Sequence, residues 1–196
     1  MSEKEQTLSG AGDRRVPGAL KKTIVMVGMM GAGKTAVGRA LAARLKAPFL
    51  DSDHEIEAAA NRTIPEIFAR DGEPFFRQKE RQVIRRLLDE ERGVLSTGGG
   101  AFLAEENRRI ISERGVAIWL NADLEVLWNR VKHRDTRPLL RTKDPHATLS
   151  ALYHERVPYY AQADLTVVSD GQASIDEMVN RVIEALRARP DVLEWI

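Results

Sequence analysis

The sequence predicts an α/β fold, a doubly wound parallel sheet of about five strands flanked by helices. Short apolar runs alternate with longer stretches in which apolar residues recur at helical spacing, the order expected of parallel strands joined by crossover helices. Neither an internal repeat nor a linker interrupts residues 22–189. At 196 residues, with 43% hydrophobic and 30% charged residues, the chain has the size and composition of one globular domain.

The expected strands and helices alternate from the first apolar run to the end of the chain. The predicted strands occupy residues 22–27, 48–51, 93–97, 116–120 and 164–168. The predicted helices occupy residues 34–45, 53–90 with internal breaks, 104–114, 123–130, 148–162 and 174–189. Strands of this length, each followed by a helical stretch, are typical of a parallel sheet with helices on both faces.

The first strand is a continuous apolar run over residues 22–27, which indicates burial on both faces. A Gly-rich turn separates it from the helix expected over residues 34–45. That helix carries three apolar residues on one face, namely Val37, Leu41 and Leu45. The second strand, residues 48–51, contains the apolar pair Phe49 and Leu50.

Helical sequence then continues from residue 53 to about residue 90, but two signals divide it. Residues 63–66, Thr-Ile-Pro-Glu, have the pattern of a capping box, which starts a new helix. Gly72 and Pro74 interrupt the pattern again. The helix after this break contains the apolar residues Phe76, Val83, Ile84 and Leu87.

In the second half of the chain, the strand over residues 93–97 runs directly into Gly98-Gly99-Gly100. The helix over residues 123–130 is expected to be capped by Asp123. Residues 132–146 are polar and basic and contain two prolines. This composition predicts a mobile lid between two helices.

These boundaries divide the chain into three parts. Residues 1–20 mix acidic and basic residues with glycine and proline, which predicts a flexible N-terminal extension. They contain no apolar segment of a secretory signal and are too acidic for an organellar transit peptide. Residues 21–190 are the predicted folded domain, and residues 191–196 are a predicted C-terminal tail.

Composition excludes several kinds of function. With 30 Lys and Arg against 29 Asp and Glu, the formal net charge is +1, so neither nucleic acid nor an anionic membrane is an expected partner. The absence of cysteine rules out disulfides, iron–sulfur clusters, thiolate zinc sites and a cysteine nucleophile. No apolar run approaches the length of a membrane span. A cytoplasmic location is therefore expected.

Residues 28–35, Gly-Met-Met-Gly-Ala-Gly-Lys-Thr, match the P-loop pattern G-x-x-x-x-G-K-[ST] between a predicted strand and a predicted helix. The glycines let backbone N–H groups surround phosphate oxygens, and the positive end of the helix faces the same anion. Lys34 is expected to reach the β and γ phosphates, and the Thr35 hydroxyl to hold Mg²⁺. The predicted ATP-binding residues of this segment are Gly31, Ala32, Gly33, Lys34, Thr35 and Ala36.

The P-loop assigns the sheet to the P-loop NTPase type, but it does not separate a kinase from an ATPase or a GTPase. The motif N-K-x-D, by which GTPases read guanine, is absent from the sequence. This absence argues against a GTPase. The reaction must be inferred from residues elsewhere in the chain.

Two acidic residues, Asp51 and Asp53, follow the second strand at the sheet edge where open α/β folds bind ligands. An acid at this edge can approach Mg²⁺ directly or through water. An acid two residues later can orient or deprotonate an attacking hydroxyl. The alternative is that Asp53 only caps the following helix. The two roles are compatible, and both stay open.

Three consecutive glycines at the end of a strand cost conformational entropy. Either another group approaches the backbone of residues 98–100 closely, or φ is positive there. The strand ends Leu95-Ser96-Thr97 and offers no Walker-B acid, so Asp51 is the expected metal helper. Arg77 and Arg156, taken singly, have the sequence surroundings of ordinary surface arginines.

Taken together, these motifs resemble the shikimate kinase family. The likeness spans residues 22–186, in the family's order and spacing. The segments that carry it are G-M-M-G-A-G-K-T, D-S-D-H-E-I-E, G-E-P-F-F-R-Q-K-E, S-T-G-G-G, R-P-L-L and E-R-V-P-Y-Y. Many families share the P-loop, whereas the Asp-x-Asp, the Phe-Arg-x-x-Glu and the triple glycine are specific in combination.

The resemblance implies transfer of the γ-phosphoryl group of ATP to the 3-hydroxyl of shikimate, with Mg²⁺ as cofactor. It implies that Asp53 binds the shikimate hydroxyls and is the base for the attacking one. Thr35 would bind Mg²⁺, with Asp51 in the outer sphere of the metal. Lys34, and Arg137 from the lid, would act on the transferred phosphate.

The resemblance also implies how the two substrates are held. The residues implied for the substrate carboxylate are Arg77, Arg156 and the backbone N–H of Gly99. Glu80 would position Arg77. Arg130 resembles the family's adenine-stacking residue, and Gln172 is expected at the base. The expected partners are ATP and shikimate, and the expected form is a monomer.

Two alternatives stay open. Another P-loop kinase, acting on gluconate or a nucleoside monophosphate, would share the nucleotide site. Against it stands the combination of Arg77, Arg156 and the triple glycine, because a planar arginine fork suits a carboxylated substrate. The second alternative is a nucleotide-dependent binding module without turnover. Asp53 counts against it, since a pure switch needs no base.

Overall fold

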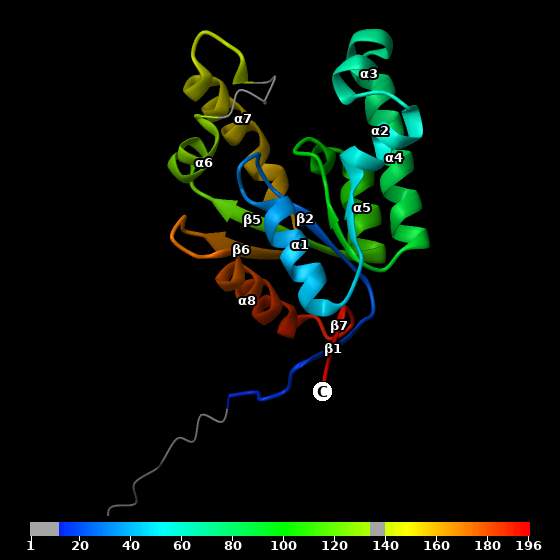
Figure 1. The fold of residues 1–196 in the computed structure, drawn as a ribbon, viewed down its shortest axis with the longest axis vertical. Helices are drawn as coiled ribbons and strands as arrows, with labels where there is room; N and C mark the ends of the chain where they lie inside the picture. Colours follow the sequence, from blue (N-terminus) through cyan, green and yellow to red (C-terminus); the bar gives the residue numbers. More distant parts are fainter. Residues whose placement is uncertain (1–11, 134–139) are drawn as a thin grey trace, which may run out of the picture.

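The computed structural model describes residues 12–133 and 140–196. Its centre is a five-stranded, all-parallel sheet with strand order β3-β4-β2-β5-β6, shown in Figure 1. The strands are β2 Thr23–Val27, β3 Phe49–Asp51, β4 Val94–Ser96, β5 Gly115–Ala122 and β6 Leu165–Ser169. The predicted fold class is confirmed.

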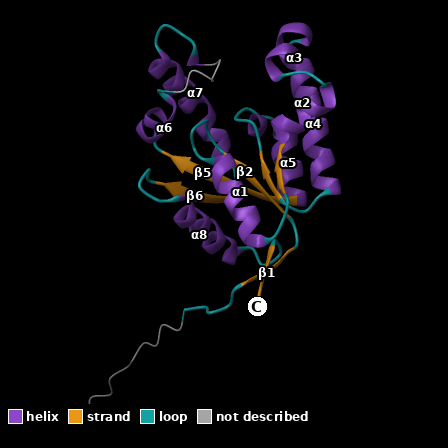
Figure 2. Ribbon diagram, viewed as in Figure 1, coloured by secondary structure: helices purple, strands orange, loops and turns teal. Residues whose placement is uncertain are grey.

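The helices are arranged in layers and groups around the sheet. They are α1 Lys34–Leu45, α2 Ser52–Ala60, α3 Ile64–Asp71, α4 Glu73–Glu90, α5 Glu105–Arg114, α6 Leu124–Val131, α7 Pro145–Tyr160 and α8 Ile175–Ala185. Short 3₁₀ turns occupy Ala101–Leu103 and Leu186–Ala188. Helices α1 and α8 pack together on one face of the sheet, and α4 and α5 pack on the other. Figure 2 shows α2, α3 and α4 as one group and α6 and α7 as another, on opposite sides of the loop between β2 and α1.

The core forms where the sheet meets these helices. Every residue of β2 is buried, and Ile24, Val25 and Met26 expose no surface. The predicted inner face of α1 is confirmed at Val37 and Leu41, which are buried against the sheet. A central parallel strand is covered on both faces and therefore needs a continuous apolar sequence. This is why the apolar run in the sequence predicted β2 correctly.

Helix starts follow the side-chain chemistry only in part. Thr63 caps α3 by accepting a hydrogen bond from the Glu66 N–H at 3.3 Å, as predicted. The complete capping box lies instead at α8, between Ser174 and Glu177. The prediction that Asp123 caps α6 is wrong in its chemistry, because Asp123 holds the N-cap position but its side chain makes no capping hydrogen bond.

The ends of the chain differ most from prediction. Strand β1, Pro17–Leu20, pairs antiparallel with β7, Leu193–Trp195. Val16 and Ile196 exchange backbone hydrogen bonds at 2.8 and 2.9 Å, and Leu193 is completely buried. The predicted tail, residues 191–196, and the last part of the predicted extension are therefore folded onto the domain. Strands of three or four residues are too short to show a periodic signal in the sequence.

The predicted lid, residues 132–146, also ends differently. Helix α7 begins at Pro145, and the Asp144 side chain caps it by accepting the Ala147 N–H at 3.1 Å. Residues 134–139, the centre of the predicted lid, lie outside the described residues. In the part of the chain that is described, no helix combines the length and the apolar character needed to cross a membrane.

We predict that Leu193→Ala lowers the free energy of unfolding by about 2–5 kcal/mol, because it leaves a cavity at a fully buried position. Urea denaturation of the whole chain measures this. Ile196→Ala is the matched control, since Ile196 is 67% exposed, and it should change the stability by less than about 0.5 kcal/mol. Equal stabilities of the two variants would show that β7 contributes nothing to the fold.

Candidate active site

The carboxyl ends of β2, β3 and β4 meet at one edge of the sheet. The strand register places Asp51 beside Ser96 and Ser96 beside Met26, two residues before Gly28. A cleft of about 1000 Å³ opens at this edge. Most of the residues predicted from the sequence line it, namely residues 31–36, Asp51, Asp53, Arg77, Glu80, residues 98–100, Arg130 and Arg156.

The P-loop has the backbone geometry of an anion site. Gly31 and Gly33 adopt φ of 81° and 96°, a region that a residue with a Cβ rarely occupies. Gly33 is the N-cap of α1 and offers no side chain to cap it, so the first N–H groups of α1 are left for a ligand. The Lys34 Nζ donates to the Gly28 and Met29 carbonyls at 2.6 and 3.0 Å, within reach of the cleft.

Arg130, on α6, lies across the P-loop. Its guanidinium donates to the Gly31 carbonyl at 3.0 Å, to the Ala32 carbonyl at 3.3 Å and to the Ser169 hydroxyl at 3.2 Å. These bonds tie α6 and the end of β6 to the phosphate-binding turn. The guanidinium is thereby fixed at the wall of the cleft.

Gln172, by contrast, is not among the residues that line the cleft. Its backbone N–H donates to Asp170 at 2.9 Å, and the residue is exposed. The lining contributed after β6 is mainly apolar and consists of Ala173, Ile175 and Met178. The sequence analysis missed these three residues, because apolar side chains at a helix start carry no distinctive motif.

The two aspartates at the junction of β3 and α2 have separate tasks. Asp51 is the N-cap of α2, and its side chain accepts the N–H groups of Asp53 and His54 at 3.0 and 3.3 Å. Asp53 lies in the first turn, and its carboxylate makes no hydrogen bond within the described residues. The interpretation of Asp53 as the helix cap is wrong, since Asp51 does the capping.

The surroundings of Asp53 raise its pKa from 3.8 to about 6. Burial is the largest cause, because it disfavours the charged carboxylate, and the negative charge of Asp51 adds to it. Lys34 and Arg77 act in the opposite direction. Asp53 is therefore a carboxylate that titrates close to neutral pH inside a cleft, as a general base requires.

The triple glycine is explained by close approach and not by its dihedral angles, since residues 98–100 are absent from the positive-φ glycines. A methyl group on Gly98 would stand 2.9 Å from Asp53 Oδ1. On Gly99 it would stand 2.7 Å from Arg156 Nη1, and on Gly100 only 2.5 Å from Arg77 Nη2. Each glycine thus makes room for one of three charged side chains.

Arg77, on α4, is held from one side by acidic residues. Its Nη1 donates to Glu80 Oε1 at 2.9 Å, and its Nε lies 3.5 Å from Glu73 Oε1. Glu80 is almost fully buried, and its second oxygen has no hydrogen-bond partner among the described residues. Burial raises the Glu80 pKa, and the adjacent Arg77 charge opposes that rise. The pair fixes Arg77 while leaving one edge of its guanidinium toward Gly100.

Arg156, on α7, is 8% exposed, although its sequence context resembles that of a surface residue. Its Nε has no hydrogen-bond partner within the described residues. A buried guanidinium with an unpaired donor is costly unless a ligand completes it. Tyr160, one turn further along α7, donates its hydroxyl to the Gly99 carbonyl at 2.5 Å. Tyr160 is not among the predicted site residues, although its spacing of four residues from Arg156 places both on one helix face.

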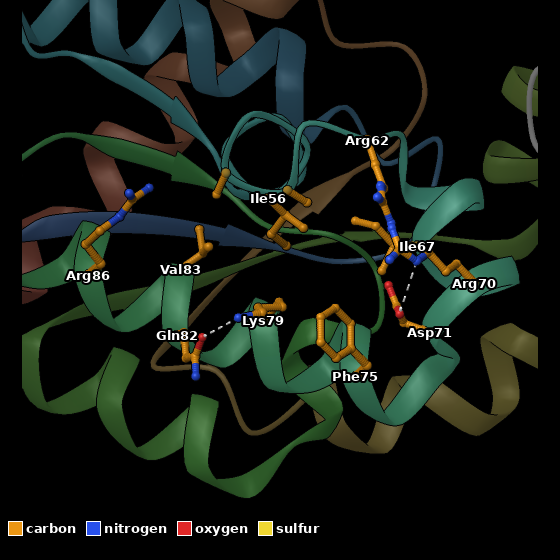
Figure 3. A pocket seen from close by; sticks show the side chains of 12 residues that line it. Ile56, Arg62, Ile67, Arg70, Asp71, Phe75, Lys79, Gln82, Val83 and Arg86 are labelled. Atoms are coloured by element: carbon orange, nitrogen blue, oxygen red, sulfur yellow. Dashed lines mark hydrogen bonds and ion pairs between the residues drawn. The ribbon is translucent and has the colours of Figure 1, made fainter.

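A second, smaller groove of about 430 Å³ lies between α2, α3 and α4. Figure 3 shows the side chains that line it. Buried Ile56, Ile67 and Val83 line it, together with several charged side chains. Two of the cations are already paired, Arg70 with Asp71 and Arg86 with Glu55. None of the site residues predicted from the sequence lines this groove, so the larger cleft is the candidate active site.

One predicted site residue is not located by the structure. Arg137 lies outside the described residues, and its predicted role on the transferred phosphate stays a prediction. Among residues 12–133 and 140–196, no three His, Cys, Asp or Glu side chains gather as a metal cluster. Thr35 and Asp51, the residues predicted to hold Mg²⁺, both line the cleft.

Comparison with known proteins identifies the family. The family model for shikimate kinase matches residues 30–187. A shikimate kinase of Ruegeria pomeroyi is 72% identical over 176 residues, which cover 90% of both chains. The chain belongs to the shikimate kinase family.

Solved structures agree at the level of the fold. A shikimate kinase from Acinetobacter baumannii, solved in complex with shikimate, superposes with a TM-score of 0.79 at 38% identity, covering 85% of this chain and 93% of that one. A gluconokinase from Sinorhizobium meliloti superposes with a TM-score of 0.56 at 19% identity, covering 87% of this chain and 94% of that one. This second likeness shows the fold alone.

We predict that Gly100→Ala raises the KM for shikimate at least about tenfold, because the new methyl displaces the Arg77 guanidinium. The KM for ATP and the Tm should change little, since a flexible side chain gives way. Steady-state kinetics and thermal unfolding measure these quantities. Gly12→Ala is the control, because a methyl group there meets nothing within 4 Å. An unchanged KM for shikimate in Gly100→Ala contradicts the close-approach explanation.

Proposed function

We propose that this chain transfers the γ-phosphoryl group of ATP to the 3-hydroxyl of shikimate, as a monomer in the cytoplasm. The observation that carries the proposal is the convergence of Asp53, Arg77 and Arg156 on the triple glycine, beside the P-loop. One carboxylate and two guanidinium groups match a substrate with hydroxyls on one side of a ring and a carboxylate on the other.

The nucleotide occupies the P-loop half of the cleft. The backbone N–H groups of residues 31–36 bind the phosphates, and Lys34 exchanges its bonds to the Gly28 and Met29 carbonyls for phosphate oxygens. Arg130, already fixed against the P-loop, supplies a flat cationic surface for the adenine. Gln172 contacts the base if the exposed turn after β6 closes over it. Arg137 reaches the transferred phosphate from the lid.

Magnesium fits this half of the cleft, because the donors at hand are hard oxygens, the ligands that Mg²⁺ prefers. The Thr35 hydroxyl would bind the ion directly and Asp51 through water. Asp51 uses one oxygen to cap α2, which leaves the other for a water molecule. When bound, the ion neutralises charge on the phosphates.

Shikimate occupies the other half of the cleft. Arg77 and Arg156 bind the carboxylate, and Arg156 thereby gains a partner for its buried, unpaired Nε. The Gly99 N–H completes the carboxylate site. Glu80 and Glu73 hold Arg77 so that little side-chain entropy is lost on binding.

Asp53 binds the hydroxyls of shikimate and takes the proton of the 3-hydroxyl as its oxygen attacks the γ-phosphorus. Phosphoryl transfer depends mainly on positioning and on charge stabilisation, so no covalent nucleophile is required. Lys34 and Arg137 stabilise the charge on the transferred group. A closed cleft excludes water, which would otherwise compete as acceptor.

The direct test is ADP release with ATP and Mg²⁺, comparing shikimate, gluconate, AMP and no acceptor. Strong stimulation by shikimate alone supports the proposal. Stimulation by gluconate or AMP instead would still indicate a kinase, but the assignment of Arg77 and Arg156 to a substrate carboxylate would be wrong. ATP binding without turnover on any acceptor would favour a nucleotide-dependent binding module.

We predict that Arg77→Ala raises the KM for shikimate about 10–100-fold, because a hydrogen-bonded charge pair to the carboxylate is lost. Arg81→Ala, one turn further on α4, is the control, since Arg81 pairs with Glu106 outside the cleft. Steady-state kinetics with shikimate as the varied substrate measures both. If Arg77→Ala leaves KM and kcat unchanged, the carboxylate clamp is wrongly assigned.

We predict that kcat/KM for shikimate falls as the pH is lowered through about 6, because Asp53 must be ionised to act as base. Asp53→Asn should lower kcat by about 10²–10⁴-fold and remove this limb of the profile.

The raised pKa of Asp53 also predicts how stability depends on pH. As the pH rises, kcat/KM should increase whereas the free energy of unfolding should decrease. A pKa raised from 3.8 to about 6 by folding means that protonated Asp53 is favoured in the folded state below about pH 4, and that this advantage is lost as the pH rises through 6. At pH 8, Asp53→Asn should therefore raise the free energy of unfolding, by an amount of the order of 3 kcal/mol. If Asp53→Asn is less stable than the unaltered chain at pH 8 and retains full activity, the role given to Asp53 is wrong.

A further inference from the structure

Tyr160 is a buried polar residue that the chemistry above does not use. It is the last residue of α7 and exposes no surface. Its ring lies beside that of Trp119 on β5, with centroids 6.2 Å apart and planes tilted by 33°. A completely buried phenol needs a hydrogen-bond partner. Tyr160 finds it in the Gly99 carbonyl, 2.5 Å away.

This hydrogen bond holds the part of the site that has no side chains of its own. Glycines 98–100 have no side chains, so only backbone contacts and neighbouring side chains fix their dihedral angles. Within the described residues, the Gly98 and Gly100 carbonyls accept the N–H groups of Ala101 and Leu103 at 3.1 and 3.2 Å. The Gly99 carbonyl, between them, is held by Tyr160. The middle peptide of the turn therefore depends on one phenol.

The same phenol lies against Arg156. A methyl group on Gly99 would be 2.7 Å from Arg156 Nη1 and 3.7 Å from the Tyr160 hydroxyl, so the two side chains meet at this glycine. Burial raises the Tyr160 pKa, and the positive charge of Arg156 opposes that rise. The phenol stays protonated and donates to Gly99, while its oxygen faces the guanidinium.

We infer that Tyr160 is a positioning residue for the acceptor half of the cleft. By holding the Gly99 carbonyl and bracing Arg156, it fixes the peptide plane between Gly99 and Gly100 and the direction of the guanidinium that binds the substrate carboxylate. The inference rests on the proposed function, since it assigns Tyr160 to the shikimate half. The P-loop connects β2 to α1, and Tyr160 makes no hydrogen bond to it within the described residues.

Tyr160→Phe tests this, because it removes the hydroxyl and keeps the ring that packs against Trp119. The KM and the Kd for shikimate should rise about tenfold, which corresponds to about 1.4 kcal/mol at 25 °C. The KM for ATP should stay within about twofold. Steady-state kinetics gives both KM values, and isothermal titration calorimetry of the folded variant gives the Kd for shikimate.

Tyr159→Phe is the matched control. It makes the same chemical change in the neighbouring residue, whose ring lies under Arg108 at 5.2 Å and away from the glycines. Its KM for shikimate should equal that of the unaltered chain. This outcome would separate the loss of the Gly99 hydrogen bond from a general effect of removing a hydroxyl from the end of α7.

Three results would overturn the inference. They are an unchanged KM for shikimate in Tyr160→Phe, an equal rise in the KM for ATP, and a lower Tm with both KM values unchanged, which marks a purely structural role. Failure of the proposed function looks different, because the unaltered chain would then not phosphorylate shikimate at all.

Discussion

The site depends on the absence of side chains at three consecutive backbone positions. A Cβ at Gly98, Gly99 or Gly100 would meet a charged atom of Asp53, Arg156 or Arg77 within 3 Å. These three side chains come from α2, α7 and α4, which lie far apart in the sequence. They can converge there because the backbone that follows β4 carries no side chains. The entropy that three glycines lose on folding is the cost of that convergence.

The convergence also concentrates buried charge. Burial raises the pKa of Asp53 and of Glu80, and Arg156 holds an unpaired donor below the surface. Each of these groups lowers the stability of the free protein relative to an apolar residue. A substrate with hydroxyls and a carboxylate relieves the same groups when it binds. Functional sites often contain groups that lower the stability of the free protein. In the proposed function, these same groups bind the substrate and take part in the reaction.

The sequence predicted those features whose cause is local. The P-loop, the continuous apolar strand β2 and the Thr63 cap each depend on a few adjacent residues, and the structure confirms them. Arg77 and Arg156 were placed at the site through a family resemblance, since nothing adjacent to Arg156 in the sequence distinguishes a buried guanidinium from a surface one.

The features that the sequence did not reveal depend on distant partners. Strands β1 and β7 stabilise each other across almost the whole chain length, and neither is long enough to show a period of its own. Asp123 is of a residue type that often caps helices and holds the N-cap position of α6, but its side chain accepts no capping hydrogen bond. Tyr160 acquires its role only because the fold brings Gly99 to it.

In the proposed function, two arginines at the triple glycine recognise the carboxylate of the acceptor. Isothermal titration calorimetry of the chain with shikimate and with its uncharged carboxamide tests this claim directly. Loss of charge-assisted hydrogen bonds should weaken binding of the carboxamide about 10–100-fold. Equal affinity for the acid and the carboxamide would contradict the account, because the two guanidinium groups would then contribute nothing to recognition.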